Sequence, residues 1–326
     1  MMDLYLKKIV IHQFTPDDTE LILSDKCLTI TPNLDTYFRK KVGKVFSDEA
    51  RRGQFDSGNV FLSYLTDDFL ESSKKIAHLW KEEFVISDNQ KTNDLVFLQF
   101  DKEGIEHFAF LRLALKESLT HIIDDDGDSP LRLTQNNLPS AAQTPDEALI
   151  INRQNQQYYL IEKRIKHNGS FANYFSENLL QVKPEQSVKK SIKMMEQTAQ
   201  KIADNFNQDD FAFHAKMKTA IYKNLEEDQE LSPEKLADQL FDSNLTARLN
   251  FIDDLKETIP ESIKVSDIDH SRQTKKLENQ KLSLSNGIEL LVPNHIYQDA
   301  ESVEFIQNQN GTYSILIKNI EDIQSK

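Results

Sequence analysis

Apolar and polar positions alternate through much of the first half of the chain, and this period of two predicts strands. The pattern runs through LYLKKIVIHQF at 4–14 and ELILSD at 20–25, which flank a turn at Pro16-Asp17-Asp18. DLVFLQF and IEHFAFLRLAL flank a polar loop that ends in Gly104, which predicts a hairpin. EALIINR and QQYYLIEKR, near positions 150 and 160, predict two further strands.

Helical spacing interrupts these strands twice. It predicts a helix over 34–46 and another over 60–84, where bulky apolar residues recur mostly three or four apart. Residues 124–146 concentrate Asp, Asn, Ser and Pro, which predicts a loop.

The period changes to 3.6 between 170 and 260. An amphipathic helix over 188–206 is predicted by Val188, Ile192, Met195, Ala199, Ile202 and Phe206. Ser232 before Pro233 is a helix start, with serine as the cap and proline at the first helical position. Apolar spacing over 245–255 predicts another helix.

The last 45 residues return to strand character. Asn286-Gly287 and Asn310-Gly311 each lie between two apolar runs, which predicts two hairpins. The chain is therefore expected to be an α+β protein, with a mixed sheet and helices in its N-terminal half, a helical middle and C-terminal β-hairpins. We expect two domains, 1–168 and 169–326, since 326 residues exceed the size of one average domain.

Composition narrows the class of protein. A single cysteine and the absence of a long apolar run indicate a soluble cytoplasmic protein with no membrane segment. Only 8 glycines make a glycine-rich phosphate loop improbable. The net charge of -14 lowers the expectation of polyanion binding, so any such contact must be confined to a local basic patch.

Motifs for catalysis are weak. Asp269-His270-Ser271 has the residue types of a triad, but consecutive side chains diverge. The acidic run at 124–128 lacks the spacing of a calcium loop. Asp146 and Glu162 superficially resemble a nuclease carboxylate pair, and a metal-dependent nuclease is the least favoured of three hypotheses. We expect no enzyme, catalytic residue, metal or cofactor.

Basic residues are the remaining chemical signal. Three clusters stand out, and together they supply enough cations for non-specific contacts to DNA phosphates. The candidate DNA-binding residues are Lys189, Lys190, Lys193 and Lys201, then Lys163, Arg164 and Lys166, and finally Arg39, Lys40 and Lys41. Lys189, Lys190 and Lys193 are the leading candidates, because they lie off the apolar seam of the 188–206 helix.

The order of segments resembles the bacterial 37-kilodalton nucleoid-associated protein family (NdpA-type) over nearly the whole chain. The resemblance is carried by Ile9-Val10-Ile11-His12-Gln13, by the aromatic segment FANYFSENLL at 171–180 and by DHSRQTKK at 269–276. It implies a nucleoid location, DNA binding and no established catalytic activity. It assigns no DNA contact to individual residues.

The favoured hypothesis is a nucleoid-associated protein that binds DNA with little sequence preference. The second is a protein-interaction module that a protein partner recruits to the nucleoid, through the acidic blocks at 53–150 or 204–262. A homo-oligomer is left open, because the apolar run YSILIKNI would form an edge strand able to pair with another copy.

Overall fold

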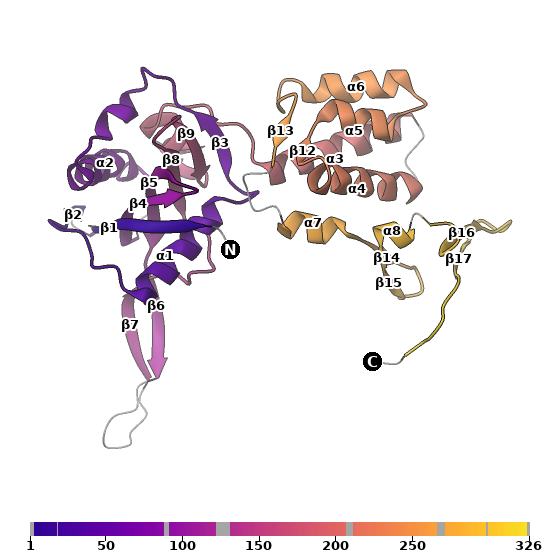
Figure 1. The fold of residues 1–326 in the computed structure, drawn as a ribbon, viewed down its shortest axis with the longest axis horizontal. Coiled ribbons are helices and arrows are strands. Elements are labelled where there is room, and N and C mark those ends of the chain that lie inside the picture. The colour runs from indigo at the N-terminus through magenta and orange to yellow at the C-terminus, as the bar shows by residue number, and fades with distance from the viewer. Residues whose placement is uncertain are drawn as a thin grey trace. The chain divides into compact units, whose positions relative to one another are not determined.

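The chain divides into two compact units, Met1–Val188 and Lys189–Lys326, here called the first and the second unit. The computed structural model describes residues 3–17, 19–87, 91–121, 131–206, 211–265, 271–297 and 299–324 (Figure 1). The predicted α+β class is confirmed, with a sheet and helices in the first unit, and helices and C-terminal hairpins in the second.

The first unit is built on a seven-stranded antiparallel sheet. Its strands follow the order β2-β1-β4-β5-β8-β9-β3. Their bounds are β1 Leu4–Thr15, β2 Glu20–Ile22, β3 Arg51–Gln54, β4 Asn93–Lys102, β5 Ile105–Ala114, β8 Glu147–Asn152 and β9 Gln157–Ile161. The two hairpins predicted around β4–β5 and β8–β9 are confirmed by their registers.

Helices cover the two faces of this sheet, because alternate residues of each strand point to opposite sides. The helix α2, Phe69–Phe84, packs Trp80 and Phe84 into the aromatic core with Phe14, Phe97 and Phe110. The opposite face meets Phe46, which follows α1, Pro32–Val45, and contacts the rings of Phe100, His107 and Tyr159.

Two segments of the first unit differ from the sequence-based prediction. The helix expected over 60–84 is a 3-10 helix, Val60–Tyr64, followed by α2. The break has a local cause, since the side chain of Asp68 accepts hydrogen bonds from the N–H groups of Leu70 and Glu71 and so starts a new helix.

The prediction of a loop over 124–146 is also partly wrong. Residues 131–137 form β7, Leu131–Asn137, which pairs with β6, Lys116–His121, in an exposed two-stranded ribbon (Figure 1). Hydroxyl groups of Ser118, Thr120 and Thr134 bond across the ribbon, so polar residues hold it together without a buried face. The acidic run at 124–128 lies outside the described residues.

The segment that follows the sheet also packs into the first unit. It contains β10 Ile165–His167, β11 Ser170–Ala172 and the short π-helix Phe175–Leu179, called η2. Tyr174, Phe175 and Leu180 belong to the same core as α2. Residues 169–188 therefore lie between the boundary proposed from the sequence and the division between the two units.

The second unit begins with four main helices. They are α3 Val188–Asn205, α4 Phe211–Glu226, α5 Pro233–Leu240 and α6 Leu245–Leu255. The predicted starts and faces are confirmed, because Ser232 caps α5 by accepting from the N–H of Lys235, and the apolar seam of α3 is buried. The short strands β12 Glu230–Leu231 and β13 Ile263–Lys264 pair beside them.

The C-terminal elements of the second unit include both predicted hairpins. They are α7 Ser271–Leu277, β14 Asn279–Ser283, β15 Glu289–Pro293, α8 Asn294–Tyr297, β16 Val303–Gln307 and β17 Tyr313–Ile317. Gly287 and Gly311 have φ of +86° and +81°, which only glycine adopts at little cost. The first hairpin is anchored where the Gln280 side chain donates to the carbonyl of Ala215 on α4.

Candidate nucleic-acid interface

The cations expected on α1 divide between its surface and its buried face. Lys40 is exposed, and Arg39 lies 3.7 Å from Asp35 one helical turn earlier. The Lys41 side chain is fully buried, and its Nζ donates to the carbonyl of Gln143 at 2.8 Å. Burial lowers the pKa of Lys41 to about 8, although the nearby Asp146 carboxylate opposes this shift. The structure therefore holds Lys41 away from solvent.

The burial of Lys41 follows from its position on the helix. Phe38, Val42 and Val45 are the other buried residues of α1, and Lys41 falls at the spacing of that seam. Gln143 also accepts a hydrogen bond from a second lysine, since Lys116 Nζ donates to the Gln143 side chain at 2.6 Å. Lys116 is exposed, and sequence reasoning did not select it because it stands outside the three basic clusters.

The second cluster follows β9 and is exposed. Lys163 lies 3.3 Å from Asp146, and Arg164 donates to the carbonyl of Phe171. Lys166 is exposed on β10. The pKa of Asp146 is lowered, since Arg112, the N–H of Ala114 and Lys163 together outweigh the effect of burial. Asp146 thus lies close to Lys41, from the predicted basic cluster on α1, and to Lys163, from the cluster after β9.

The third cluster lies on α3 of the second unit. Lys189, Lys190 and Lys193 are exposed, while Val188, Ile192 and Met195 of the same helix are buried. This arrangement is the amphipathic pattern predicted from the sequence. Lys201, about two turns after Lys193, forms an ion pair with Asp254 of α6 at 2.8 Å. We call the exposed side chains of Lys189, Lys190 and Lys193 the basic face of α3.

Further exposed cations lie on α7, which sequence reasoning did not select as a DNA contact. They are Arg272, Lys275 and Lys276. The sequence signal for these cations is their density, since all of them lie within the seven residues of α7. Asp269 and His270, the other members of the triad-like run, lie outside the described residues.

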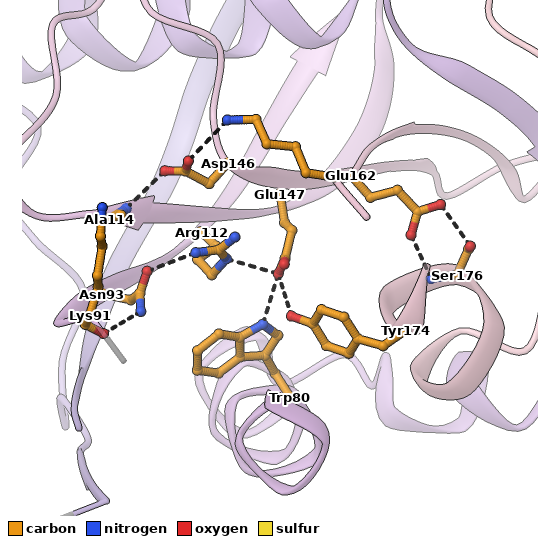
Figure 2. Close-up of polar contacts among 11 residues, drawn as sticks. Trp80, Lys91, Asn93, Arg112, Ala114, Asp146, Glu147, Glu162, Tyr174 and Ser176 are labelled. Atoms are coloured by element: carbon orange, nitrogen blue, oxygen red, sulfur yellow. Dashed lines mark hydrogen bonds and ion pairs between the residues drawn. The ribbon is translucent and has the colours of Figure 1, made fainter. Parts of the chain in front are cut away.

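The two carboxylates of the nuclease hypothesis have separate partners. Asp146 accepts from the Ala114 N–H and pairs with Lys163, whereas Glu162 accepts from the N–H and hydroxyl of Ser176 (Figure 2). Arg51 also pairs with Glu162, at 2.6 Å. In the described part of the chain, no group of three or more His, Cys, Asp or Glu side chains is arranged to hold a metal ion.

A buried polar cluster that the sequence did not reveal links the sheet to α2 and to the segment before η2. Glu147 Oε2 accepts from Trp80 Nε1 at 3.0 Å and from the Tyr174 hydroxyl at 2.7 Å, and it lies 3.0 Å from Arg112 Nε (Figure 2). Arg112 also donates to the Asn93 side chain at 3.1 Å. Among the residues that the structure describes, none donates a hydrogen bond to the other oxygen of Glu147, Oε1.

Burial sets the electrostatics of this cluster. Glu147 and Tyr174 are completely buried, and Arg112 is 2% exposed. Burial opposes the charge on Arg112, but Glu147, together with smaller contributions from Tyr174 and Asp146, outweighs that effect and raises the pKa of the guanidinium. Burial and the same carboxylate raise the pKa of the Tyr174 hydroxyl. This cluster has no access to solvent, so we assign it a structural role.

Comparison with known families adds one finding. The model of the family described as NA37, nucleoid-associated protein YejK, matches residues 10–323. None of the curated proteins compared matches the chain. Among the described residues, no helix is long and apolar enough to cross a membrane. The family match spans both compact units.

Proposed function

The chain belongs to the nucleoid-associated protein YejK family, and from this membership we propose that it binds duplex DNA directly and with little sequence preference. The proposed contacts are ion pairs between exposed Lys or Arg side chains and DNA phosphates. The proposed role is binding at the nucleoid rather than catalysis, in keeping with the description of the family.

The start of α3 carries this proposal. Lys189 and Lys190 lie in the first turn of the helix, which contains no acidic residue. Cations at a helix N-terminus face the positive end of the helix dipole, an arrangement that costs about 0.3–1 kcal/mol each. A phosphate placed there would interact favourably with the lysines and with the dipole. Lys193, one turn later, extends the same exposed face.

The first unit offers a second set of cations for the same chemistry. Lys40, Lys116 and Lys163 are exposed. Lys116 donates to Gln143, which also accepts from buried Lys41, and Lys163 pairs with Asp146. These residues supply further phosphate contacts in the proposal. Lys41 is omitted because its ammonium group is buried and already donates to Gln143.

The first test measures fluorescence anisotropy of a labelled random-sequence duplex between about 50 and 200 mM salt. We expect the affinity to fall steeply with salt, because each phosphate contact releases counterions. Replacing Lys189, Lys190 and Lys193 together with glutamine, which keeps helix propensity, is expected to weaken binding about tenfold. The slope of log affinity against log salt should become shallower by about 0.9 for each phosphate ion pair that the substitutions remove.

A matched control separates a local effect from one of net charge. Glutamine at Lys216, Lys235 and Lys256 changes the net charge equally and within the same unit, at lysines that lie outside α3. This variant should bind nearly as tightly as the parent. Equal losses of affinity in both triple variants would contradict a contact on α3, and no binding at low salt would favour recruitment by a protein partner.

Lys41 provides a second prediction. Replacing Lys41 with methionine removes one positive charge, but we expect DNA affinity to change by less than about twofold, because a buried ammonium contributes no phosphate contact. Replacing exposed Lys163 with methionine is the comparison, and its salt slope should become shallower. A larger loss of affinity for Lys41 than for Lys163, with both variants folded by circular dichroism, would show that the Lys41 ammonium reaches DNA.

A further inference from the structure

The C-terminal hairpin leaves one strand uncovered. The strands β16 and β17 pair only with each other in the described residues. On one face of this hairpin, Val303 of β16 is 5% exposed, whereas its direct cross-strand neighbour Ile317 of β17 is 48% exposed. Phe305 on β16 contacts the ring of Tyr297 from α8. On this face of the hairpin, neighbouring side chains therefore bury β16 but leave β17 exposed.

The sequence of β17 also lacks the features that protect edge strands. Exposed edges usually carry charges or proline, contain a β-bulge, or are very short, which prevents pairing with another chain. Among the described strands of four or more residues with an open edge, every one except β17 has a charged residue. The two edges of the main sheet show this, since β2 has three residues and β3 contains Arg51 and Arg52. The sequence of β17 is YSILI, with Tyr313 67% exposed.

We propose that β17 is a self-association surface, and that its occupant is the β17 strand of a second copy of this chain. An antiparallel pair centred on Ile315 would join two β-hairpins into one four-stranded sheet. A two-fold axis through that centre makes the interface self-complementary. The proposal is independent of DNA binding.

Self-complementarity is what favours a second copy over another partner. With Ile315 opposite its own counterpart, Tyr313 of one copy faces Ile317 of the other, an aromatic and β-branched pair of the kind that stabilises sheets. In the same register Lys318 faces Thr312, so no like charges oppose each other. The added strand would supply main-chain hydrogen bonds to the open edge of β17 and cover its exposed apolar residues. An isolated two-stranded hairpin is marginally stable in water, so this pairing would also stabilise β16 and β17.

Disulfide trapping tests the proposed register in the full chain. Exposed Cys27 is first replaced with serine, so that each introduced cysteine is the only one. Opposite residues at the two-fold axis have Cα atoms about 4.5–5.5 Å apart, which suits a disulfide. Ile315→Cys should therefore form a covalent dimer under mild oxidation. Tyr313→Cys should not, because its counterpart lies about 13 Å away along the strand.

Light scattering after size-exclusion chromatography supplies the second readout. The parent is expected to show a dimer mass at micromolar concentrations, and Ile317→Lys a monomer mass. Leu291→Lys is the matched control, since Leu291 is 68% exposed on β15, whose sequence already contains Glu289 and Pro293. This variant should remain dimeric. A monomeric parent, or equal cross-linking of the cysteines at 313 and 315, would overturn the proposal, whatever the folding of the lysine variants.

Discussion

Replacing Arg112 with methionine is expected to lower the free energy of unfolding by about 3–5 kcal/mol. The substitution leaves the completely buried Glu147 carboxylate without its cation, and the remaining hydrogen bonds from Trp80 and Tyr174 do not neutralise its charge. Urea titration at neutral pH measures this change. Trp80, the only tryptophan in the chain, donates to Glu147 and is a direct fluorescence probe of the site.

A double variant shows whether the destabilisation arises from the unpaired charge or from poorer packing. Arg112→Met combined with Glu147→Leu removes both charges and is expected to recover a large part of the stability, because apolar replacements of buried ion pairs are often well tolerated. The double variant leaves the Trp80 and Tyr174 donors without an acceptor, so full recovery is not expected. If the double variant is as unstable as the single one, the charge of Glu147 is not the cause.

This buried cluster is also where prediction from the sequence stopped. Glu147 opens an apolar run, and Arg112 lies inside another, with no periodic signal to connect them. Their contact arises only because β5 and β8 are neighbours in the sheet, with Arg112 directly opposite Glu147. Strand order depends on pairings between distant segments, which one sequence does not specify. Local signals were sufficient for the strands themselves and for the capped helix after Ser232.

The candidate interface could likewise be predicted from the sequence only in part. The spacing of Val188, Ile192 and Met195 was enough to place Lys189 and Lys193 on the exposed face of α3. The same helical spacing places Lys41 on the buried face of α1, whereas the density of charge at 39–41 predicts a surface contact. The association of Lys116 with Gln143 and Lys41 depends on contacts between residues more than twenty positions apart, so it required the fold.

His12 is expected to make the stability of the first unit depend on pH. Its ring is completely buried between β1 and α2, where Nδ1 accepts from the N–H of Ser24 and Nε2 lies 3.0 Å from the Ser73 hydroxyl. Because Nδ1 accepts, the proton of the neutral ring is on Nε2. Burial, with smaller effects of Lys74 and His78, lowers the pKa of His12 to about 4.

The sign of the effect follows from the two pKa values. The unfolded chain protonates His12 near pH 6.5, whereas the folded protein resists protonation until about pH 4. The unfolded state therefore binds more protons between these values, and stability falls as the pH is lowered through this window. At about 1.4 kcal/mol per pH unit, His12 accounts for a loss of about 2 kcal/mol between pH 7.5 and 5.

Urea titrations at pH 7.5 and 5 measure this loss in the parent and in His12→Asn, whose side-chain oxygen can still accept from Ser24 but does not titrate. Burial also lowers the pKa of His107, which contributes a loss of the same sign to both proteins. The asparagine variant should therefore lose about 2 kcal/mol less than the parent. Equal losses would show that His12 is already protonated in the folded protein at pH 5, and that its hydrogen bond from Ser24 is broken there.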